Sequence, residues 1–160
     1  MRKFILLVSL FAMQAQMFAG NIDSIFNEFK DSRKAEYVSV SPFLMAIGRM
    51  FMSDEEDDIA KRIRSIKVLD LEDCSSSVKE RFNKKVSGLD KNDYETLMSV
   101  KEDDENVQIL VKEKKNIIKE MVIVCGGKDD CALILIKGDI RPEDINKLVE
   151  QETEKIHGDK

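Results

Sequence analysis

From Tyr94 onward the hydrophobic pattern of the chain repeats every second residue, and this change of period constrains the fold more than any other feature. Four β-type runs follow one another, at residues 94–101, 107–113, 117–125 and 131–137, and their connections are short and polar or rich in Gly. Short connections join antiparallel neighbours, so the runs predict a four-stranded antiparallel meander. The last two runs carry apolar residues on both faces and predict the more central strands.

Helical spacing predominates before this point. Asn21 can cap a helix whose apolar stripe extends from Ile22 to Phe29. Ser41 and Pro42 offer an N-cap and a first-turn proline for a second helix over residues 43–52. Methionines at positions 45, 50 and 52 widen the apolar surface of that helix. We expect it to be covered on most sides, with its methionines in the core rather than on an adaptable binding surface.

Two more helices are predicted. Ser77 and Glu80 match a capping box, and Gly88 marks the end of the helix that they open. Arg141 and Pro142 open the last helix. Their buried stripes are predicted to be Val78, Phe82, Val86 and Leu89 in the first helix, and Ile145, Leu148 and Val149 in the second.

Short β-type runs at residues 37–40 and 65–71 complete the pattern. We therefore predict an α+β fold. A four-stranded antiparallel meander in the C-terminal half, open to extension by one or two N-terminal strands, would pack against about four helices. Residues 20–160 show no internal repeat and are predicted to form a single domain with a frayed C-terminal tail.

The first residues have the layout of a secretory signal peptide. Arg2 and Lys3 precede an apolar run at residues 4–13, and small residues follow at Ala15 and Ala19. As a helix, that run spans about 15 Å, half of a hydrocarbon core of about 30 Å, which disfavours a membrane anchor. We expect cleavage after Ala19, with Ala15 as the alternative, and no stable membrane insertion once residues 1–19 are removed. The location implied is outside the cytoplasm.

The charge balance narrows the class of partner. The chain has 26 basic and 31 acidic residues, a formal net charge of −5, and loss of Arg2 and Lys3 makes it more acidic still. Nucleic acid is therefore excluded as the expected partner, because phosphate binding needs a basic surface. A content of 42% hydrophobic and 36% charged residues suits one soluble domain.

No catalytic residue can be singled out. The single histidine, His157, lies four residues from the end of the sequence, where a base would not be held in place. This argues against Ser-His and Cys-His catalysis and against most zinc sites. Acidic residues cluster at 54–58, 103–105 and 129–130, which is typical of solvated loops, and the first cluster lacks the spacing of a calcium loop. We predict no metal and no cofactor.

Three cysteines remain, Cys74, Cys125 and Cys131. Cys125 and Cys131 flank one hairpin loop, and a disulfide between them and two buried thiols are equal alternatives. Gly126, Gly127 and Lys128 lie in the same loop. The loop joins two strands, so these residues indicate a hairpin turn rather than a phosphate-binding loop.

From Tyr37 onward the chain resembles a bacterial secreted family known as domain of unknown function 4252. The residues that carry the resemblance are Tyr37-Val38-Ser39-Val40-Ser41, 94–101, 107–115, 135–140, 143–145 and Leu148. The resemblance implies a signal peptide, a single α+β domain and an envelope location, in the periplasm or the outer envelope. It implies no activity, because the family has none assigned, and no catalytic residue carries over.

The sequence thus favours a secreted, non-catalytic envelope protein, a protein-binding or signalling-accessory module whose partner is another envelope protein. An exposed sheet edge or the methionine-rich helix would provide the contact. The alternatives are a hydrolase using paired carboxylates and a carrier of a small ligand or lipid. A cleft with converging carboxylates would favour the hydrolase, a closed apolar cavity the carrier, and an exposed apolar patch the binding module.

Overall fold

The computed structural model describes residues 21–50, 61–89 and 93–143. Several sequence predictions fall outside these residues: the signal segment and its cleavage at Ala19, the acidic run 54–58, the stripe of the last helix beyond residue 143, and His157. Within residues 21–50, 61–89 and 93–143, no helix has the length and apolar character that crossing a membrane requires.

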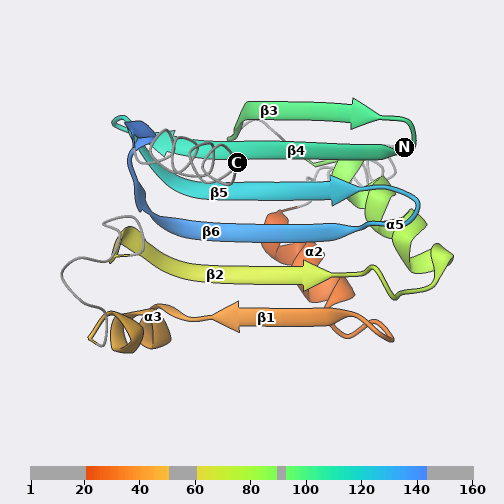
Figure 1. Ribbon diagram of the computed structural model, residues 1–160, viewed down its shortest axis with the longest axis horizontal. Helices are drawn as coiled ribbons and strands as arrows, with labels where there is room; N and C mark the ends of the chain where they lie inside the picture. Colours follow the sequence, from red (N-terminus) through yellow and green to blue (C-terminus); the bar gives the residue numbers. More distant parts are fainter. Residues whose placement is uncertain (1–20, 51–60, 90–92, 144–160) are drawn as a thin grey trace, which may run out of the picture.

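The described residues contain one antiparallel sheet of six strands in the order β1-β2-β6-β5-β4-β3 (Figure 1). Strands β3 to β6 follow one another as the predicted meander, and β6 and β5 are central, as predicted. The strands are β1 Glu36–Val40, β2 Ile63–Asp70, β3 Glu95–Glu102, β4 Glu105–Lys114, β5 Ile117–Gly126 and β6 Ala132–Ile140.

The predicted fold class was wrong about the architecture. The N-terminal strands are not an optional extension of a four-stranded meander, because β2 pairs with β6 along its length, with Ile66 opposite Ile136 and Leu69 opposite Leu133. β1 then pairs with β2, which makes a single six-stranded sheet. Three helices are described rather than about four: α2 Ile22–Phe29, α3 Pro42–Arg49 and α5 Ser76–Ser87.

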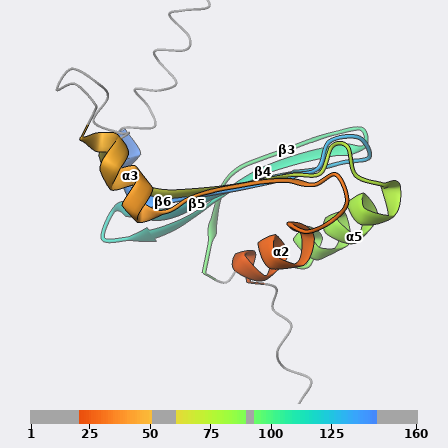
Figure 2. The same ribbon diagram turned by 90° about the horizontal axis from the view of Figure 1, so that it is seen from below.

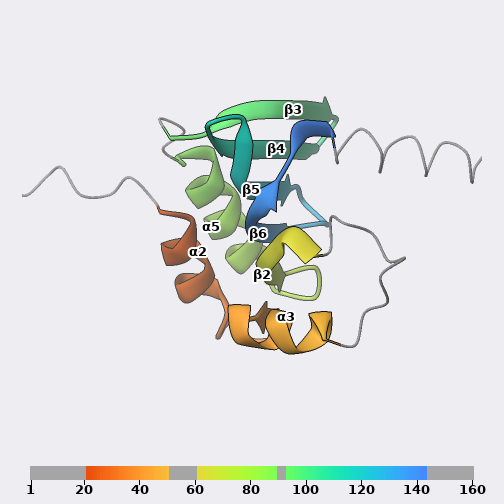
Figure 3. The ribbon, with the colours of Figure 1, turned by 90° about the vertical axis from the view of Figure 1, so that its left-hand side faces the viewer.

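Helices α2 and α5 lie side by side on one face of the sheet (Figures 2 and 3). As predicted, the Asn21 side chain caps α2 by accepting from the backbone N–H of Asp23 at 3.2 Å, and Gly88 is the C-cap of α5. The capping box was wrong, because α5 begins two residues earlier than a helix capped by Ser77 would. Its N-cap is Ser75, whose side chain makes no capping hydrogen bond and lies 3.1 Å from the Ser77 hydroxyl.

The main core lies between these two helices and the sheet. The apolar stripe of α2 is buried, as predicted, and so are Phe82 and Leu89 from the stripe of α5. Val78 and Val86 are partly buried against the same cluster. The sheet contributes two adjacent rows of buried residues, Leu69, Leu133 and Val124 in one and Leu135, Val122 and Leu110 in the other.

Candidate functional site

The face of the sheet away from α2 and α5 carries an apolar row that crosses every strand. Residues directly opposite one another in the ladder point to the same face, so the strand registers define the row. The pairs Val38–Val68, Val68–Ile134, Ile134–Ile123, Ile123–Ile109 and Ile109–Met98 link all six strands. Not one of its members is polar.

Two further rows flank this central row. One contains Val40, Ile66, Ile136, Met121 and Val111, and it ends at Glu95 on β3. The other contains Ala132, Cys125, Val107 and Val100, and it begins with Glu36 and Asp70 on β1 and β2. We call the three rows together the open face. Its three carboxylates stand at two opposite corners, and its middle is apolar.

Most side chains of the open face are exposed or half-buried because α2 and α5 pack on the opposite face of the sheet (Figure 2). At the two ends of the central row, Val38 is 57% exposed and Met98 is 45% exposed. Ile134 and Ile123 in the middle are half-buried by their neighbours in the sheet. Val111 is buried in a second, smaller cluster with Ile118 and Ile140. The open face is thus an extended apolar surface that neither α2 nor α5 covers.

Helix α3 follows β1 and lies near the end of the sheet opposite to α5 (Figure 1). The Ser41 hydroxyl accepts from the Leu44 N–H at 3.4 Å, and Pro42 occupies the first turn, as predicted. The expectation that this helix is covered on most sides was wrong. Phe43 is 73% exposed, Met50 is 81% exposed and Ile47 is exposed as well, so a stripe with spacing i, i+4, i+7 faces solvent. Apolar composition predicted burial here, yet among the described residues only β2 packs against the helix to any extent.

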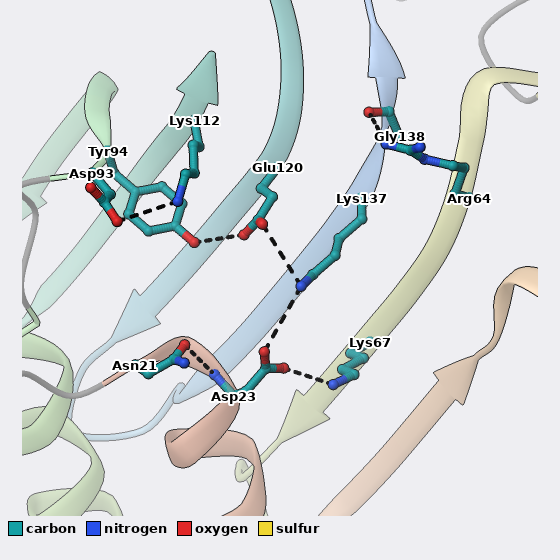
Figure 4. A network of polar contacts seen from close by, with 10 residues as sticks. All are labelled: Asn21, Asp23, Arg64, Lys67, Asp93, Tyr94, Lys112, Glu120, Lys137 and Gly138. Atoms are coloured by element: carbon teal, nitrogen blue, oxygen red, sulfur yellow. Dashed lines mark hydrogen bonds and ion pairs between the residues drawn. The ribbon is translucent and has the colours of Figure 1, made fainter. Parts of the chain in front are cut away.

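Polar side chains interrupt the covered face beyond the helical core (Figure 4). Lys67 Nζ on β2 donates to Asp23 Oδ1 at 2.7 Å, and this bond fixes the first turn of α2 to the sheet. Lys137 on β6 lies 3.8 Å from both Asp23 Oδ2 and Glu120 Oε1. The Tyr94 hydroxyl donates to Glu120 Oε2 at 2.8 Å. These contacts form one chain from β2 through α2, β6 and β5 to the segment that precedes β3.

The electrostatics of this network indicate a structural role for Asp23. The hydrogen bond from Lys67 lowers the pKa of Asp23 below its usual value, against the effect of burial. Burial first, and the hydrogen bond to Glu120 second, raise the pKa of Tyr94. A carboxylic acid serving as a proton donor near neutral pH needs a raised pKa, which is the opposite of the shift at Asp23.

A groove of about 770 Å³ lies between α5 and the ends of β3, β4 and β5. It is open to solvent, and its lining is mixed, with Lys79, Lys101 and Lys128 beside Glu80 and Asp104. Lys79 Nζ donates a hydrogen bond to the carbonyl oxygen of Asp129 at 2.7 Å. The groove is therefore not the closed apolar cavity that a lipid carrier would need.

Comparison with family models places the chain in a family. A family model described as a domain of unknown function (DUF4252) matches residues 29–148, which include α3, α5 and the whole sheet. The chain belongs to the DUF4252 family. No curated protein and no solved structure gives a significant match.

The cysteines of this DUF4252 domain are free thiols. The register places Cys125 opposite Ala132 on the open face, rather than opposite Cys131. The Cys131 thiol instead lies toward α5, with Sγ 3.2 Å from the Gly127 carbonyl oxygen and 3.7 Å from Asn83 Oδ1. Among the described residues, no three His, Cys, Asp or Glu side chains are grouped as a metal site.

The predicted glycine turn joins β5 to β6 in this DUF4252 domain, as expected. Asn83 on α5 donates to the Gly127 carbonyl oxygen at 2.7 Å and so fixes the turn against the helix. A Cβ at Gly126 would stand 2.8 Å from Asn83 Oδ1, so a larger residue there would displace the Asn83 side chain. Sequence reasoning missed the open face as a site. Its signal was the placing of Val107, Ile109 and Val111 on one face of their strand, with Gln108 and Lys112 on the other. This pattern defines two faces but does not tell which of them the helices cover.

Proposed function

We propose that this protein is an exported, non-catalytic binding module that docks a partner protein on its open face. The observation that carries the proposal is the central row, six apolar side chains that cross all six strands and face away from both core helices. A contiguous apolar surface of this kind on a soluble protein is often a binding site.

The size of the open face supports this proposal. Six strands about 4.8 Å apart and three rows about 7 Å apart make a surface of about 500 Å² in projection. The largest apolar patch on a typical monomer is about 300–600 Å² and is often functional. The exposed apolar stripe of α3 is not included in the area of the open face and adds to the apolar surface of the molecule.

The hydrolase and the carrier receive less support. A hydrolase would need two carboxylates converging in a cleft with at least one raised pKa, whereas Asp23 has a lowered pKa and Glu120 is held by Tyr94 and Lys137. A carrier would need an enclosed apolar cavity, whereas the groove beside α5 is open and lined with charge.

Site-specific photo-crosslinking in producing cells tests the docking role. A photo-reactive residue is placed at Val38, on the open face, or at Ser39, the next residue of β1, which points to the other face and is also exposed. We expect a protein adduct from position 38 and none from position 39. Equal adducts, or none from either position, would contradict docking on the open face.

Export is tested separately. If residues 1–19 direct secretion, N-terminal sequencing of the native protein starts at Gly20, or near Gln16 if Ala15 is the cleavage site. Recovery of the intact Met1 terminus from the membrane fraction would contradict export with cleavage.

A further inference from the structure

We infer that the partner on the open face is a second copy of this chain, packed sheet against sheet around a two-fold axis. The inference rests on the proposed docking role of this surface and names its occupant. Three properties of the open face carry it: its width, the position of its charges and its area.

The width of the open face favours a sheet over a helix. The central row extends from Val38 on one edge strand to Met98 on the other, about 24 Å for six strands. A docked helix that lies parallel to the strands is about 10 Å across and would cover about two strands. It would leave the exposed side chains at both ends of the row in water. A second sheet of the same width covers the whole row, at a separation of about 10 Å.

The charges of the open face also favour a copy of itself. The middle is free of charged side chains, and the carboxylates of Glu36, Asp70 and Glu95 lie at its corners, where the rim of an interface remains wet. A two-fold axis between two such sheets brings the central row of one copy onto the central row of the other. Branched side chains at Val68, Ile134 and Ile123 then interdigitate with their own counterparts, as in the core of a sandwich.

The area predicts a dimer of moderate strength. A specific interface buries about 800 Å² per partner, and the open face offers about 500 Å² in projection, somewhat more as accessible surface. The full chain carries a net charge of −5, and the chain without Arg2 and Lys3 is more acidic still, so the two copies repel each other. We therefore expect dissociation in the micromolar range, and tighter association as salt screens that repulsion.

Sedimentation velocity of the purified native protein, from about 1 to 300 µM, tests the inference with two matched pairs of variants. Val38→Lys and Met98→Lys place a charge at either end of the central row, where both parent side chains are exposed and folding tolerates the change. Ser39→Lys and Ser99→Lys place the same charge one residue away on the opposite side of the same strands. Circular dichroism spectra show whether each variant is folded.

We expect wild type and both serine variants to share one monomer–dimer equilibrium, and each open-face variant to weaken it at least about tenfold, as burial of a charge implies. A wild type that stays monomeric throughout, or serine variants that weaken dimers as much as the others, would overturn the inference.

If wild type is monomeric yet position 38 crosslinks to a different protein, the self-association fails while the docking role stands. If deletion of residues 144–160 converts a monomer into a dimer, the chain's own C-terminal segment occupies the face, and the inference is overturned for the intact protein.

Discussion

Phe29 of α2 and Phe82 of α5 meet edge to face, with ring centroids 5.6 Å apart and ring planes at 84°. Both rings are fully buried, so this pair joins the two helices at the point where they cover the sheet. Aromatic pairs in this geometry contribute about 0.5–1.5 kcal/mol beyond the burial of their area.

Phe82→Ala should therefore lower the free energy of unfolding by about 3–5 kcal/mol, through lost burial and the cavity that remains. Phe43→Ala is the matched control, because Phe43 is 73% exposed on α3, and it should change the stability of the monomer by less than about 0.5 kcal/mol. Urea unfolding of both variants at low protein concentration measures the difference. Equal midpoints would mean that α5 does not pack as described.

The ion pair between Asp23 and Lys67 should make the free energy of unfolding depend on pH in the acidic range. The pKa of Asp23 is lowered in the folded state, so its contribution is present above the unfolded pKa and is lost as pH falls through the folded value. Both side chains are about one-third or more exposed, and solvent screening limits the contribution to about 1 kcal/mol or less. Asp23→Asn should remove it at pH 7 and flatten the acid limb of the stability curve.

Asp31→Asn is the control for that substitution, because Asp31 is exposed and follows the end of α2. Thermal melts of wild type and the two variants between pH 7 and pH 3 make the comparison. If Asp23→Asn and wild type lose stability in parallel over this range, Asp23 does not fix α2 to the sheet in solution.

Local sequence patterns predicted the parts of the fold that form from neighbouring residues. The stripe from Ile22 to Phe29 and the meander from β3 to β6 depend on contacts between adjacent turns or adjacent strands, so their period is visible in the sequence. The pairing of Ile66 with Ile136 joins residues far apart in the chain. Its choice depends on which strand edge the folded meander leaves free, and periodicity does not contain that information.

The candidate site was less predictable for a related reason. The alternation of Ile109 with Gln108 shows that β4 has two different faces, but the helices pack over the face that carries Gln108 and leave Ile109 open. Burial of neighbouring Leu110 against α5 and α2 decides this, and it is a tertiary effect. The same holds for Phe43 and Met50. The apolar composition of their segment suggested a covered helix, although no described element covers these two side chains.

The register around the β5–β6 turn predicts three free thiols. Cys125 pairs with Ala132 on the open face, and Cys131 Sγ contacts the Gly127 carbonyl oxygen on the other side of the sheet. Thiol counting on unfolded, unreduced protein should find all three. A single free thiol would instead reveal the disulfide and a ladder shifted by one residue at this turn.

In the folded protein, burial raises the pKa of Cys125 and of Cys74 above the usual thiol value. The thiolate is the reactive form, so alkylation at pH 7.5 should be slow and should speed up with rising pH or with urea. Alkylation of Cys125 at the rate of a small free thiol would contradict its burial. Its rate is also sensitive to docking, because Cys125 lies on the open face.

Two glycines should respond to alanine in opposite directions. A Cβ at Gly138 on β6 would stand 2.5 Å from the carbonyl oxygen of Arg62 and 3.1 Å from the Cα of Ile63, both backbone atoms that cannot rotate away. Gly138→Ala must therefore separate β2 from β6 near the bulge that follows Ile63, and overpacking of this kind costs about 1–3 kcal/mol. A Cβ at Gly48 in α3 meets nothing within 4 Å, so Gly48→Ala should stabilise by about 0.5–1 kcal/mol through helix propensity alone. Urea unfolding of the two variants measures both changes in the free energy of unfolding, a decrease for Gly138→Ala and an increase for Gly48→Ala. A Gly138→Ala variant as stable as wild type would show that β2 does not approach β6 as closely as the register requires.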